Sequence, residues 1–191
     1  MIGKFLARVL RSKKHFAKAD DGVAAVEFAL VVLPFIMVLG VVLETGIMMF
    51  TEYTLQASVQ QAARLMRTGQ AQASGMSAAA FKTEICKTAG IIMNCASGVT
   101  VYSDSAPTFA ALKTKLPLNL NIGIQPDGSA SAASYKCGAP LEAVGVVATY
   151  DWKFIFPFMD FNANVAGGKK KRLVGIAMFS NEPYPAGATC P

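Results

Sequence analysis

A long apolar segment near the N-terminus constrains this chain more than any other feature. Residues 23–50 read VAAVEFALVVLPFIMVLGVVLETGIMMF, 28 residues with only two charges, Glu27 and Glu44. At a rise of about 1.5 Å per residue, a helix of this length crosses a hydrocarbon core of about 30 Å. No second segment of comparable length follows. The sequence therefore predicts one membrane-spanning helix.

The charges around this segment predict its orientation. Residues 1–22 hold six Lys or Arg and two Asp, a net charge of +4, and the next basic residue is Arg64. By the positive-inside rule, the N-terminus lies in the cytoplasm and residues 51–191 lie in the periplasm. A cleaved secretory signal peptide is the alternative, but its apolar region is shorter, about 7–15 residues, and ends at an A-x-A-like site that is not clear here. We expect an uncleaved or leader-trimmed anchor.

Helical periodicity continues beyond the apolar segment. Leu55, Val59, Ala62 and Met66 recur at i, i+4, i+7 and i+11, which places them on one face of a helix. We therefore expect the helix to cover residues 23–68, with this stripe packed on the chain's own C-terminal domain rather than on another subunit. The small-residue stretch 69–78 is expected to end the helix and to act as a hinge.

Residues 69–191 are predicted to form one small periplasmic domain, because roughly 120 residues suffice for a single core. Four segments carry helix or strand patterns, which are a helix at Phe81–Gly90 and strands at Val99–Ser105, Leu141–Phe154 and Arg172–Asn181. Residues 119–138 and 157–168 have loop composition. The predicted fold class is α+β, with an antiparallel sheet of three or four strands packed on a helix.

The charge of the exported part argues against nucleic-acid binding. Residues 23–191 contain twelve basic and ten acidic residues, a net charge of only +2, and the one basic cluster is Lys169–Arg172. A nucleic-acid surface requires a broader basic stripe. We expect this cluster to lie in a solvated hairpin turn after Gly167 and Gly168.

Four cysteines follow the membrane segment, on the side where disulfides persist: Cys86, Cys95, Cys137 and Cys190. Four cysteines allow three pairings. Locality favours a short Cys86–Cys95 loop and a Cys137–Cys190 bridge that fastens the long loop to the C-terminal tail. The spacing lacks any CxxC pair and the only histidine is His15, so no metal site is predicted.

No catalytic signature is present in the sequence. There is no GxSxG, phosphate-binding loop or HExxH, and Asp151 and Asp160 are too isolated to form a catalytic pair by sequence. Five aromatic residues gather between positions 152 and 161, and core packing or a subunit contact is the expected use: Trp152, Phe154, Phe156, Phe158 and Phe161. We predict a non-enzymatic protein without a cofactor.

A short motif stands at the start of the apolar segment. A basic leader ends at Gly22, the helix begins at Val23, and Glu27 and Phe28 are the fifth and sixth residues after the glycine. This arrangement resembles the site that a prepilin peptidase cuts in type IV pilin-related proteins. The resemblance implies cleavage between Gly22 and Val23 and a role for Glu27 in subunit assembly. A carboxylate at this depth can also be a tolerated residue that reaches the lipid headgroups.

The wider sequence is similar to the TadE-like minor pilins, or pseudopilins, of tight-adherence (Flp) pilus assembly. The similarity covers about residues 20–70, including Glu44 and Gly46, where Thr45 replaces the usual aromatic residue, and the ending FSNEPYP at 179–185. It implies a type IV pilin-like protein that acts in pilus assembly, anchoring and adhesion. The implied partners are prepilin peptidase, other pilins and minor pilins, the inner-membrane assembly platform and the lipid bilayer.

The implied location is the inner membrane, crossed once, with residues 1–22 as a cytoplasmic leader and with the pilus as a further destination. Two other interpretations remain open. One is a membrane-anchored periplasmic binding module unrelated to a filament, and the other is a membrane-tethered hydrolase with an unrecognised carboxylate site.

Overall fold

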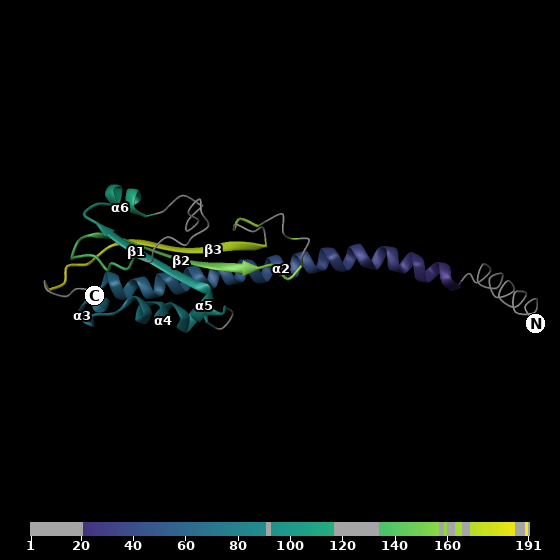
Figure 1. The fold of residues 1–191 in the computed structure, drawn as a ribbon, viewed down its shortest axis with the longest axis horizontal. Coiled ribbons are helices and arrows are strands. Elements are labelled where there is room, and N and C mark those ends of the chain that lie inside the picture. Colours follow the sequence, from purple (N-terminus) through teal and green to yellow (C-terminus); the bar gives the residue numbers. More distant parts are fainter. Residues whose placement is uncertain are drawn as a thin grey trace, which may run out of the picture. The chain divides into compact units, whose positions relative to one another are not determined.

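The computed structural model describes residues 21–90, 93–116, 134–156, 159, 163–165, 169–185 and 190. Along this part of the chain the elements follow the order α2, α3, α4, α5, β1, α6, β2, β3 (Figure 1). The chain divides into two compact units, one up to Leu43 and one from Glu44 onward. A long apolar helix followed by a small antiparallel sheet confirms the predicted α+β class.

Helix α2 spans Asp21–Arg67, 47 residues, and ends at a glycine turn. Gly69 has a φ of 76°, and its N–H donates to the Met66 carbonyl at 3.1 Å. A left-handed residue just past the last turn is a common way to end a helix, and glycine adopts it at least cost. Arg64 and Arg67 occupy the last turn, where cations interact favourably with the helix dipole. The predicted long helix is therefore present.

Three short helices follow: α3 at Gln70–Ala73, α4 at Ala78–Ala89 and α5 at Cys95–Gly98. The Ser77 hydroxyl accepts the Ala80 N–H at 3.2 Å and so caps the start of α4. Phe81, Ile85 and Ala89 are buried on one face of α4, four residues apart. The predicted helix at 81–90 is confirmed and begins one turn earlier.

The sheet has three antiparallel strands in the order β1-β2-β3: Val99–Ala106, Ala143–Lys153 and Lys170–Ser180. Strand β2 is central, and its register pairs Val147 with Tyr102 on one side and with Ile176 on the other. The three strand predictions are confirmed. On strand β3, the Gln56 side chain of α2 donates to the Ile176 carbonyl and accepts the Ile176 N–H, each at 2.8 Å. These bonds satisfy two backbone groups that an edge strand would otherwise leave unpaired.

The two faces of the sheet carry separate apolar cores. One face packs Val144, Val146 and Ala148 against α2 and α4, and the opposite face packs Val147 and its neighbours against α6, Phe109–Lys115. Figure 1 shows α6 across the sheet from α2 and α4. This division follows from the alternation of side chains along β2. The stripe predicted from the sequence is fully buried, which confirms that the chain's own domain covers it: Leu55, Val59, Ala62 and Met66.

Two expectations about irregular segments are wrong. Lys170, Lys171 and Arg172 form the start of β3 rather than a hairpin turn, because they pair with the end of β2 and Arg172 meets Asp151 across the ladder at 2.7 Å. The stretch 69–78 ends α2 as predicted but is no free hinge. It contains α3, whose Ala71 and Gln72 are buried in the domain.

Candidate functional site

The sequence-predicted cleavage and assembly residues lie at the start of α2. Gly22 is the second residue of the helix, and a Cβ added to it would meet no atom within 4 Å. Val23 and Phe28 are 56% and 69% exposed, and Glu27 is exposed as well. All four residues are therefore accessible in the described structure to a protease, to lipid or to another subunit. The basic leader at 1–20 lies outside the described residues.

The part of α2 from Val23 to Leu43 is apolar around its circumference apart from Glu27, and the described residues leave most of it exposed. Most of its large apolar residues are exposed: Val23, Val26, Phe28, Leu30, Val31, Leu33, Phe35, Ile36, Met37, Val38, Leu39, Val42 and Leu43. A helix that is hydrophobic on all sides is normally buried or spans a membrane. In the described part of the chain, this is the one helix long and apolar enough to cross a bilayer.

Glu44, the first residue of the second unit, makes hydrogen bonds that the sequence did not predict. Its side chain is 1% exposed. One carboxylate oxygen accepts the Ile155 N–H at 2.6 Å and lies 3.4 Å from the Trp152 indole nitrogen, and the other accepts the Phe156 N–H at 3.1 Å. Three N–H donors compensate for the loss of water around the carboxylate. Glu44 thus holds the segment after β2 against α2.

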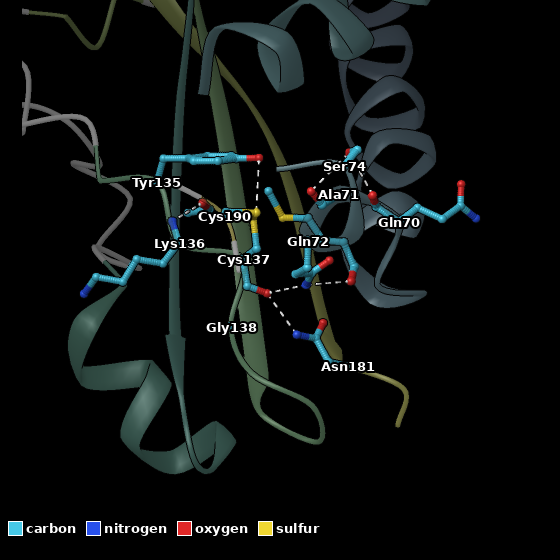
Figure 2. The surroundings of a disulfide bond; sticks show 12 residues. Gln70, Ala71, Gln72, Ser74, Tyr135, Lys136, Cys137, Gly138, Asn181 and Cys190 are labelled. Carbon is cyan, nitrogen blue, oxygen red and sulfur yellow. Dashed lines mark hydrogen bonds between the residues drawn. A yellow bond between two sulfur atoms is a disulfide. The ribbon is translucent and has the colours of Figure 1, made fainter. Parts of the chain in front are cut away.

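A second polar cluster surrounds the backbone of Cys137 at the other end of the sheet. Figure 2 shows the Cys137 carbonyl receiving N–H donors from Gln72 and Asn181, both at 2.9 Å. Gln72 also donates to the Met66 carbonyl at 3.0 Å, and Asn181 donates to the Ala139 carbonyl at 3.0 Å. The cluster therefore joins the end of α2, helix α3, the approach to β2 and the tail after β3.

The tail after β3 packs on the end of α2. The Tyr184 ring covers Gly69 so closely that a Cβ there would lie 2.7 Å from the ring. The Tyr184 hydroxyl donates to the Gly138 carbonyl at 2.8 Å, and burial raises the pKa of this tyrosine. Arg67 and Glu182 form an exposed ion pair at 3.3 Å. The Asn-Glu-Pro-Tyr segment at 181–184 is thus a structural fastening.

Two disulfides complete the domain, Cys86–Cys95 between α4 and α5 and Cys137–Cys190 between the approach to β2 and the tail. This is the pairing that locality favours in the sequence. Tyr135 stands beside the second bridge, with its hydroxyl 3.9 Å from Cys190 Sγ (Figure 2). Its ring centroid lies 5.7 Å from that of Phe81. Burial raises the pKa of Tyr135 to about 12.

The remaining candidate residues play structural parts where they can be described. Trp152 and Phe154 pack into or against the main core, whereas Phe158, Phe161 and Asp160 lie outside the described residues. Asp151 pairs with Arg172. Among the described residues, no group of three His, Cys, Asp or Glu side chains is placed to hold a metal ion.

Sequence reasoning missed what Glu44 and Gln56 bind. Glu44 was visible as a charge that interrupts an apolar helix, but its partners follow 108 or more residues later. Gln56 resembles any exposed helix residue in sequence, and its partner Ile176 lies 120 residues away. Contacts at such separation leave no local pattern to detect.

The comparison with known protein families matches part of the segment on which the sequence resemblance is based. Residues 22–64 match the sequence model of a protein family described as TadE-like protein. No curated protein and no solved structure matches the chain. The match includes Gly22, Glu27 and Glu44 and stops just before the end of α2. The chain therefore carries, at residues 22–64, the TadE-like segment that its sequence resemblance predicted.

Proposed function

We propose that this protein is a non-enzymatic minor pilin of a tight-adherence pilus, held in the inner membrane by the first part of α2. The TadE-like match suggests a protein associated with this type of pilus. The observation that carries the proposal is the exposed apolar part of α2 from Val23 to Leu43, because a helix of this kind requires either lipid or the helices of other subunits around it.

In this proposal a prepilin peptidase cuts between Gly22 and Val23, and Glu27 then acts in assembly. Cleavage frees an α-amino group with a pKa of about 7.7–8.0, which is mostly protonated at neutral pH. This cation can pair with a carboxylate that is costly to leave alone in an apolar surrounding. Glu27, exposed on the same helix one turn later, is the candidate for that carboxylate, in its own subunit or in a neighbour.

The cleavage step is tested by mass spectrometry of the protein extracted from membranes of a piliated host. Gly22→Leu should block processing, because a bulky side chain hinders approach to the scissile carbonyl. Gly46→Leu is the matched control, since Gly46 lies in the same helix and an added Cβ likewise meets nothing within 4 Å. Retention of residues 1–22 by the native protein would refute cleavage.

The assembly step is tested with Glu27→Ala and a control, Glu52→Ala, which removes another exposed carboxylate of α2. Glu27→Ala should leave cleavage intact and strongly reduce piliation, whereas Glu52→Ala should change neither. Normal piliation with Glu27→Ala would show that Glu27 has no role in assembly and is only a tolerated residue near the headgroups.

Orientation and class are tested separately. A reporter fused after Gly69 should be active in the periplasm, and cytoplasmic activity would overturn the topology. Co-purification of the intact protein with pilins and the assembly platform supports the pilin role. Its absence, with a stable anchored protein, favours a periplasmic binding module unrelated to a filament.

A further inference from the structure

The end of the sheet next to Glu44 combines an exposed apolar residue with basic residues. Lys153 ends β2 and pairs in register with Lys170, which begins β3. Ile155, two residues after β2, is 64% exposed although its backbone is fixed by Glu44. Lys153, Ile155 and Lys170 line one surface hollow of about 560 Å³ together with Asp151, whose carboxylate is paired with Arg172. No carboxylate of the described residues lies within ion-pair distance of either lysine.

If α2 spans a bilayer, the length of its uncharged run determines how deep in the membrane Glu44 and the surface beside it lie. The run from Phe28 to Leu43 has 16 residues, about 24 Å of helix, and a hydrocarbon core of about 30 Å needs roughly four more. Wherever those residues are added, Glu44 lies within about 6 Å of the outer boundary of the core. Its bonds to Ile155 and Phe156 hold that segment at nearly the same depth.

Apolar and basic side chains at this depth are suited to the boundary between the lipid acyl chains and the headgroups. An exposed isoleucine is favourable in the acyl boundary, and lysine ammonium groups interact with anionic phospholipid headgroups just outside it.

We propose that Ile155, Lys153 and Lys170 form an interfacial contact with the outer leaflet of the same membrane that α2 crosses. Ile155 inserts at the acyl boundary, and the two lysines bind anionic headgroups. The contact rests on the proposed anchoring by α2. It gives the exported domain a fixed orientation on the membrane, through the Glu44 carboxylate that positions the segment.

The experiment uses the full chain in vesicles of phosphatidylcholine with and without phosphatidylglycerol. Ile155→Cys is labelled with an environment-sensitive fluorophore, since the native cysteines of the described structure are all paired. Phe109→Cys is the matched control, because Phe109 is 52% exposed and begins α6, near the opposite end of the sheet. Only the label at 155 should shift to the blue, resist aqueous iodide and be quenched by spin-labelled lipid. Equal access of iodide to both labels in a chain that floats with the vesicles would overturn the inference.

A further measurement separates the possible failures. Lys153→Gln with Lys170→Gln should weaken insertion in anionic vesicles, by roughly fivefold per lysine, and should have little effect in neutral ones. A chain that does not float with vesicles would instead contradict the proposed anchor.

Discussion

The carboxylate of Glu44 and the backbone of Ile155 are joined by a 2.6 Å hydrogen bond, although 111 residues separate them in the chain. This bond ties the first residue of the second unit to the segment that follows the central strand. A buried carboxylate with three donors is stable only while all of them remain in place. Glu44 therefore stabilises the folded domain in addition to forming part of helix α2.

Glu44→Gln should destabilise the domain by about 1–3 kcal/mol, because the amide keeps one acceptor oxygen and places an NH₂ group against a backbone N–H. Unfolding of the full chain in detergent micelles by denaturant, followed by Trp152 fluorescence, measures the change. Glu52→Gln, which alters an exposed carboxylate on the same helix, should change stability little. Equal effects of the two variants would contradict the role of the Glu44 bonds.

Much of the fold was accessible from local patterns. The stripe from Leu55 to Met66, the alternation along β2 and the turn glycine after α2 are all short-range signals, and the structure agrees with them. Local charge misled at Lys170–Arg172, where strand pairing outweighs the preference of a basic run for solvent. Helix α6 was missed, although Thr108 caps it with a hydroxyl that accepts the Ala111 N–H. Short helices carry few periodic residues.

The candidate site likewise has one part that local sequence patterns predict and another that they do not. Gly22, Glu27 and the family segment were recognisable because they lie within a few residues of one another. The Glu44 contact and the cluster around Cys137 join segments far apart in the sequence, and their geometry is fixed by the tertiary fold. A single sequence contains no local trace of them.

Gly69→Ala should cost considerably more stability than Gly75→Ala. Both glycines have positive φ, 76° and 58°, so alanine incurs about 1–2 kcal/mol of backbone strain at either site. Only at Gly69 does the new Cβ also meet the Tyr184 ring, at 2.7 Å. Thermal unfolding of the two variants measures the difference. When Gly69→Ala is added to Tyr184→Ala, the further loss of stability should be no larger than that caused by Gly75→Ala. A larger loss would show that the ring is not the cause.

Removal of the Cys137–Cys190 bridge should destabilise the domain more than removal of Cys86–Cys95. The two bridges join residues 53 and 9 positions apart. Loop-closure entropy then gives about 4 kcal/mol for the long loop and about 2.5–3 kcal/mol for the short one. Paired Cys→Ala variants, compared by denaturant unfolding, test this order. Non-reducing peptide mapping of the native protein tests the pairing itself, and a peptide joining Cys86 to Cys137 would contradict it.

The stability of the domain should fall steeply in alkaline solution because of Tyr135. Burial raises the pKa of its folded-state hydroxyl to about 12, against about 10 in the unfolded chain. The folded state therefore holds this proton more tightly. The resulting contribution to stability is fully present below about pH 10 and is lost as the pH rises from there towards 12.

Tyr135→Phe should keep the contact with Phe81 and remove this part of the pH dependence. Unfolding free energies measured between neutral pH and about pH 12, with short incubations that spare the disulfides, give the slope for each protein. Some slope remains in the variant, since burial also raises the pKa of Tyr102 and Tyr184. Tyr53→Phe, at a tyrosine that is 72% exposed, should leave the slope as it is in the native chain. A slope unchanged by Tyr135→Phe would mean that another group controls the alkaline transition, and tyrosinate absorbance during the titration would then show which tyrosine ionises first.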